Sequence, residues 1–137
     1  MIDLRLIREQ PDAVRAAIAK LHTEAPIDEI LELDKRRRRT LTGVEALKAE
    51  RNEGSKLVQR AKDPGERQSL IENLRTLGDR IDVLDREEKT IERKLHALLL
   101  LVPNLPAENV PVGASEDENV VVAEHGRRRD FGFVPRP

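Results

Sequence analysis

Apolar residues recur every three or four positions along two long stretches of the chain. In the second stretch the spacing alternates strictly by four and three. Its ten positions are all apolar except Glu88: Leu70, Leu74, Leu77, Ile81, Leu84, Glu88, Ile91, Leu95, Leu98 and Val102. This spacing is the heptad repeat with which one helix packs along another. It predicts a long helix with a single apolar seam.

The first stretch, residues 28–61, carries a less regular version of the same repeat. Three of its inward positions, Arg37, Arg51 and Gly54, fill a core poorly. At ~1.5 Å per residue this helix should be ~50 Å long. The predicted inward positions are Ile30, Leu33, Arg37, Thr40, Val44, Leu47, Arg51, Gly54, Val58 and Ala61.

A short break at residues 62–66 separates the two stretches. Asp63 suits an N-cap, Pro64 the first helical position, and Glu66 the third position after a cap. So short a link requires antiparallel helices, whose partner residues have numbers that sum to about 128. Glu88 should therefore face Arg37, and such a pair can fix the register.

Residues 1–26 are predicted to form a short helical base. Asp3 can cap a first turn, and Pro11 suits the start of a second helix. The base should cover the end of the second long helix, because Leu98–Val102 is apolar on every side and is predicted to be buried.

Residues 103–137 differ in composition from the rest. They contain several Pro residues and acids, and we expect an extended connector followed by the first piece of a missing part of the protein. Val120–Val122 is a candidate short strand. The predicted fold class is therefore all-α: a long antiparallel coiled-coil hairpin at residues 27–102, with a turn near 62–66, a small helical base, and an extended C-terminal tail.

Several functions are disfavoured by what the sequence lacks. There is no Cys, the three His residues are far apart, and aromatic residues make up 1% of the chain. No metal site is expected, and neither a Gly-rich phosphate loop nor a nucleophile motif is present. We also expect a cytoplasmic location without membrane contact, because no apolar run approaches the ~20 residues that span a bilayer.

Charge is strongly segregated although the net charge is only −1. Residues 35–62 contain ten Lys and Arg against three acids, whereas residues 107–124 contain five acids and no base. A basic helix can bind RNA phosphates and release their counterions. Because this region has no aromatic residue for stacking on bases, structured helical RNA is the favoured partner. The candidate RNA-binding residues are Lys35, Arg38, Arg39, Lys48, Asn52, Lys56, Arg60 and Lys62.

Four blocks of residues along the chain form a specific pattern when taken in order: Met1-Ile2-Asp3-Leu4 with Ile7-Arg8 and Pro11; Leu33-Asp34 and Arg37-Arg38 with Glu50-Arg51-Asn52 and Ser55-Lys56; Pro103-Asn104, Pro106, Val110-Pro111, Gly113 and Glu118-Asn119; and Phe131, Phe133 and Pro135. In these blocks the chain resembles the N-terminal arm of bacterial-type seryl-tRNA synthetases. Gln10 stands where Asn is commoner in that family, and Leu21-His22 where Arg-Gly is usual.

The resemblance implies that the arm binds the long variable arm and elbow of serine tRNA. It also implies that residues 103–137 are the linker to, and the truncated start of, a missing class II catalytic domain that uses ATP, Mg²⁺ and serine. None of that domain's three signature motifs is present here. The family is homodimeric mainly through that domain, so the fragment alone can be a monomer. The alternative is a structural coiled coil that binds protein and no RNA. Periodicity does not separate the two, but such a module has no need of the linker blocks after Pro103.

Overall fold

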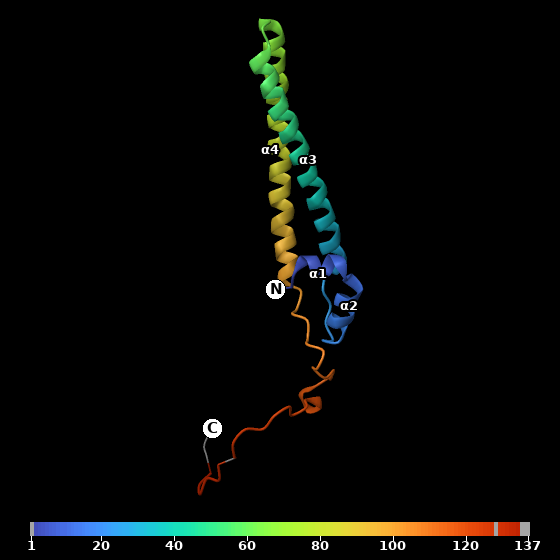
Figure 1. Ribbon diagram of the computed structural model, residues 1–137. Coiled ribbons are helices and arrows are strands. Elements are labelled where there is room, and N and C mark those ends of the chain that lie inside the picture. Colours follow the sequence, from blue (N-terminus) through green and yellow to red (C-terminus); the bar gives the residue numbers. More distant parts are fainter. Residues whose placement is uncertain (1, 128, 135–137) are drawn as a thin grey trace. The chain divides into compact units, whose positions relative to one another are not determined.

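The computed structural model describes residues 2–127 and 129–134 of the chain. The described chain divides into two compact units, with the boundary along the sequence between Pro106 and Ala107. The first unit contains four helices and the second a single 3₁₀ turn (Figure 1). The elements are α1 (Leu4–Glu9), α2 (Pro11–Ala19), α3 (Ile27–Arg60), α4 (Pro64–Leu100) and η1 (Glu116–Glu118).

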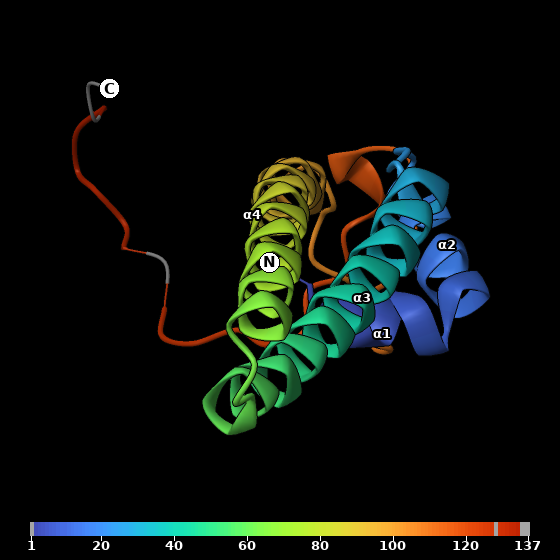
Figure 2. The ribbon, with the colours of Figure 1, turned by 90° about the horizontal axis from the view of Figure 1, so that it is seen from above.

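Helices α3 and α4 lie side by side as an antiparallel hairpin (Figures 1 and 2). Gly43 faces Leu84, and a Cβ atom placed on Gly54 would lie only 2.7 Å from Leu74 Cδ2. The two residue numbers in each pair sum to about 128, as the short link requires. The predicted hairpin and its register are therefore confirmed.

The capping residues predicted from the sequence take up their positions. The side chain of Asp63 accepts a 2.8 Å hydrogen bond from the backbone N–H of Glu66, and Pro64 is the first residue of α4. Asp3 accepts a 2.8 Å bond from the N–H of Arg5 at the start of α1. These bonds satisfy N–H groups that the first turn of a helix leaves without a partner.

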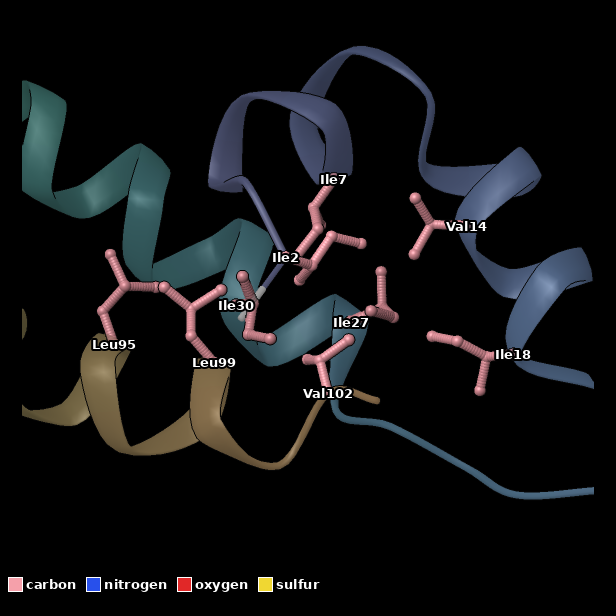
Figure 3. Close-up of a cluster of buried hydrophobic side chains, with 9 residues drawn as sticks. All are labelled: Ile2, Ile7, Val14, Ile18, Ile27, Ile30, Leu95, Leu99 and Val102. Carbon is pink, nitrogen blue, oxygen red and sulfur yellow. The ribbon is translucent and has the colours of Figure 1, made fainter. Parts of the chain in front are cut away.

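The apolar core is concentrated where the base meets the ends of the two long helices. Ile30 of α3 and Ile7 of α1 are fully buried there. Towards the tip the burial falls, and Leu57 is 52% exposed. Two helices that pack together bury only one stripe of side chains each, so a thicker core forms only where α1 and α2 also pack against α3 and α4. Figure 3 shows the cluster: Ile2, Ile7, Val14, Ile18, Ile27, Ile30, Leu95, Leu99 and Val102.

Three details of the sequence prediction are wrong. Leu99 and Val102 are buried, but Leu100 and Leu101 are 63% and 65% exposed. Five consecutive helical residues point in all directions around the helix axis. Because the base packs against only one side of this end of α4, Leu100 and Leu101 remain exposed to solvent. Arg51 is exposed and not in the seam, because a long side chain can carry its charge out to water.

The third correction concerns the second unit. Val120–Val122 does not form a strand and is exposed. A strand needs a neighbour for its hydrogen bonds, and no strand occurs in the described part of the chain. Phe131 and Phe133 contact each other with ring centroids 5.5 Å apart. Pro135 of the last resembling block lies outside the described residues.

Candidate nucleic-acid interface

Helix α3 carries seven of the eight candidate binding residues, and Lys62 follows just beyond the end of the helix. The heptad that turns Ile30 and Val44 inward places its b, c and f positions on the opposite side of the helix. All eight candidates are exposed. Six of them form two groups, and the remaining two, Lys48 and Asn52, lie between these groups along the chain.

The first group, which we call the basal cluster, consists of Lys35, Arg38, Arg39 and Thr42. These residues lie at positions i, i+3, i+4 and i+7 of α3 and therefore on one face of the helix. Together they line a single open hollow in the surface. Within the described residues, Lys35 and Arg39 form no ion pair. Two free cations and a hydroxyl thus border the same depression.

The second group, the distal cluster, consists of Lys56, Arg60 and Lys62. Arg60 and Lys62 have no carboxylate partner within the described range, whereas Lys56 Nζ lies 2.6 Å from Glu53 Oε1. The 17 residues from Arg39 to Lys56 correspond to about 25 Å along the helix axis. The two clusters could therefore contact separate phosphates of one RNA.

Two further candidates lie between the clusters and differ from them. Lys48 Nζ is 3.4 Å from Asp85 Oδ1 of α4, so this side chain already has a partner across the hairpin. Asn52 is exposed and uncharged. Exposed ion pairs contribute only ~0–1 kcal/mol, so Lys48 and Lys56 can exchange their carboxylates for phosphates at low cost.

Arg36 and Arg37 belong to the same run of cations but point towards α4. Arg36 Nη2 lies 2.7 Å from Glu87 Oε1. Arg37 Nη2 lies 3.9 Å from Glu88 Oε1, which confirms the predicted pair, but the closer partner is Glu92 at 2.7 Å. Glu92 is one turn beyond Glu88 on the same face of α4, within reach of the long Arg side chain. Both arginines tie the helices together and are less available to a ligand.

Asp34 is a residue of this region that the sequence reasoning missed. Its side chain is 2% exposed, and its Oδ2 accepts a 3.1 Å hydrogen bond from Nε of Arg38. Arg8 Nη1 of α1 lies 3.7 Å from the same oxygen. The i, i+4 spacing of Asp34 and Arg38 could have predicted their ion pair from the sequence. The approach of Arg8 could not have been predicted in this way, because it depends on how α1 packs against α3.

Helix α4 also bears exposed cations, including Arg75, Arg86 and Lys89. Its seven Lys and Arg are interspersed with eight acids, however, so its surface is close to neutral. The positive field of the hairpin is therefore expected on the α3 side. Within the described residues no cluster of three His, Asp or Glu could hold a metal ion. No described helix is long and apolar enough to cross a membrane.

Fold and surface together define a class of protein domain: a helical-hairpin arm on a small helical base, with basic residues gathered on one helix. The family model of the seryl-tRNA synthetase N-terminal domain matches residues 1–106. The chain belongs to that family.

Individual relatives agree with this assignment. The serine–tRNA ligase of Thermomicrobium roseum is 56% identical over 137 residues, covering 100% of this chain and 31% of the relative. That of Roseiflexus castenholzii is 46% identical over 138 residues, covering 100% and 32%. The chain therefore spans about one third of the length of these curated relatives.

A solved structure shows the same fold. The seryl-tRNA synthetase of Pyrococcus horikoshii, crystallised with ATP, superposes with a TM-score of 0.79 at 33% identity. The match covers 88% of this chain and 28% of that one. The all-helical hairpin predicted from the heptads is thus an architecture found in that family.

Proposed function

We propose that this chain is the tRNA-binding arm of a serine–tRNA ligase, and that it binds the long variable arm and elbow of serine tRNA by shape and phosphate contacts. The observation that carries the proposal is the outward face of α3. Its cations Lys35, Arg39 and Arg60 are exposed and have no ion-pair partner in the described part of the chain, and the same holds for Lys62 just beyond the end of the helix. Such residues are free to neutralise phosphates and release counterions.

The composition of the arm supports recognition of RNA shape over reading of unpaired bases. The only aromatic residues of the chain are Phe131 and Phe133, which lie outside the hairpin. Single-stranded RNA is usually bound by stacking on aromatic rings. A folded RNA helix, by contrast, can be bound through its backbone alone.

The whole enzyme is proposed to attach serine to tRNA, as the names of the relatives suggest, and to use the ATP with which the Pyrococcus horikoshii structure is complexed. The described residues offer no group of carboxylates or imidazoles that fits Mg²⁺. We propose, on the family resemblance, that ATP and Mg²⁺ bind in a separate catalytic domain. We expect that enzyme to be a cytoplasmic homodimer, and this arm alone to be a monomer.

A protein-binding hairpin without RNA affinity is the competing function. It would need a stripe of large apolar side chains on the outward face, whereas between the two clusters this face of α3 carries the small residues Ala46 and Ala49 and the polar Asn52. The small residues and flanking cations favour close approach of an RNA backbone.

The test is a titration of the chain with serine tRNA and with the same tRNA lacking its variable arm. We expect weaker binding of the shortened tRNA, and equal binding of both would contradict the proposal. A triple variant, Lys35→Ala, Arg39→Ala and Arg60→Ala, should lower the affinity about tenfold or more at low salt.

A matched control removes the same charge from the other helix. Arg75→Ala, Arg86→Ala and Lys89→Ala together delete three exposed cations of α4 that form no ion pair among the residues the structure describes. If attraction to RNA were only a matter of net charge, both triple variants would lose the same affinity. The proposal requires a clearly smaller loss, about threefold or less, in the α4 variant.

A further inference from the structure

A buried carboxylate lies directly beneath the basal cluster. The Asp34 side chain is 2% exposed, although it belongs to a helix whose neighbouring positions are strongly basic. Two guanidinium groups approach the same oxygen, that of Arg38 at 3.1 Å and that of Arg8 at 3.7 Å. The buried negative charge is thus compensated from α1 and from α3 at once.

The geometry leaves part of Arg38 free for a ligand. Its Nε donates to Asp34, while its side chain remains 54% exposed. Arg38 also lines the hollow shared with Lys35, Arg39 and Thr42. A guanidinium group has five N–H donors, so one bond to Asp34 leaves the others for a phosphate.

We propose that Asp34 is a positioning residue that holds Arg38 in the orientation in which it donates to an RNA phosphate in the basal cluster. The inference rests on the proposed RNA-binding function and deepens it. An unrestrained Arg loses rotamer freedom when it binds, whereas a side chain already held in place loses less. The anchor therefore raises affinity without touching the RNA.

Two effects of Asp34 on RNA binding have opposite signs, which makes the proposal testable. As a negative charge near a polyanion, Asp34 should weaken binding, and its removal should strengthen it. As an anchor for Arg38 it should strengthen binding, and its removal should weaken it. Asp34→Asn keeps the shape of the side chain and removes the charge, so the direction of the change distinguishes the two roles.

The experiment is a titration of serine tRNA with the wild type, Asp34→Asn, Arg38→Ala and the double variant, at one salt concentration. We expect Asp34→Asn to lower the affinity about two- to tenfold, the range for freeing one long side chain. In the Arg38→Ala background the same substitution should cause no loss. Unchanged or tighter binding of Asp34→Asn, or an equal loss in both backgrounds, would overturn the proposal.

Two charge-conserving variants separate positioning from folding. Arg8→Lys weakens only the link between α1 and Asp34, and it should bind tRNA like the wild type. A loss as large as that of Asp34→Asn would assign the effect to the base and overturn the proposal. If Asp34→Asn does not fold by circular dichroism, Arg38→Lys provides the test: we expect a similar loss, and wild-type affinity would contradict the inference.

The outcomes also distinguish this inference from the proposed function itself. If the wild type shows no salt-dependent affinity for serine tRNA, the proposed function is wrong. If the wild type binds with a clear salt dependence while Asp34→Asn binds at least as tightly, the arm binds RNA but Asp34 does not position Arg38.

Discussion

Two glycines near the tip of the hairpin allow its packing to be tested by matched substitutions. Gly54 lies in α3 and Gly78 in α4, so both are inside helices. Replacing a Gly inside a helix with Ala gains about 1 kcal/mol of helix propensity. The steric surroundings differ: a Cβ atom at Gly78 would meet nothing within 4 Å, whereas one at Gly54 would lie 2.7 Å from Leu74 Cδ2.

We therefore expect different effects on stability. Gly78→Ala should raise the free energy of unfolding by about 1 kcal/mol. Gly54→Ala has the same propensity gain, but the end of the Leu74 side chain must shift to admit the Cβ atom, at the low end of the usual overpacking cost of about 1–3 kcal/mol, so its net effect should be about 0 kcal/mol. In urea, with a slope of ~1–3 kcal/mol per molar, the midpoints should differ by about 0.5 M.

A second substitution checks that the clash with Leu74 is the cause. In a Leu74→Ala background the added Cβ has room, so Gly54→Ala should become stabilising. The interaction energy from this double-mutant cycle should be at least about 1 kcal/mol. If both Gly→Ala variants change stability equally, α3 and α4 do not approach each other at Gly54, and the register is wrong.

Two further predictions concern the base. His22, just after α2, has a positive φ of 50°, a backbone conformation that is unfavourable for residues with a Cβ atom. His22→Gly should therefore stabilise the chain by about 0.5–1 kcal/mol, measured by thermal or urea unfolding, and destabilisation would contradict the assigned conformation. Ile30→Ala should lower the free energy of unfolding by about 2–5 kcal/mol, because Ile30 is fully buried. Leu57→Ala, at a half-exposed position, should lower it by less than about 1 kcal/mol. Similar losses of stability in both variants would show that the core is not concentrated at the base.

The long-range arrangement of the hairpin could be predicted from local signals. Strict heptad spacing predicts the seam of α4, and Asp63 with Pro64 marks where the chain reverses. A short turn then leaves a single antiparallel register, and this is why the approach of Arg37 to Glu88 could be stated from residue numbers alone. The resemblance, which leads us to expect Gly where His22 stands, also agrees with the positive φ found at His22.

The candidate site was less predictable because exposure and pairing depend on neighbours distant in sequence. The position of Arg38 in the repeat correctly indicates an outward side chain, but not that Asp34 is buried beside it or that Arg8 arrives from α1. Likewise, the pairing of Lys48 with Asp85 depends on side-chain reach across the hairpin. Leu100 and Leu101 show the same limit, since periodicity cannot say how far the base extends around α4.

The salt dependence of tRNA binding tests the central claim most directly. Each phosphate neutralised by a cation steepens the plot of log affinity against log salt concentration by ~0.7–0.9. The variant that lacks Lys35, Arg39 and Arg60 should therefore show a slope shallower than that of the wild type by about 2–3, while the variant that lacks Arg75, Arg86 and Lys89 should keep the wild-type slope within about 1. Equal slopes for the wild type and the α3 variant would contradict the claim that the outward face of α3 binds the RNA backbone.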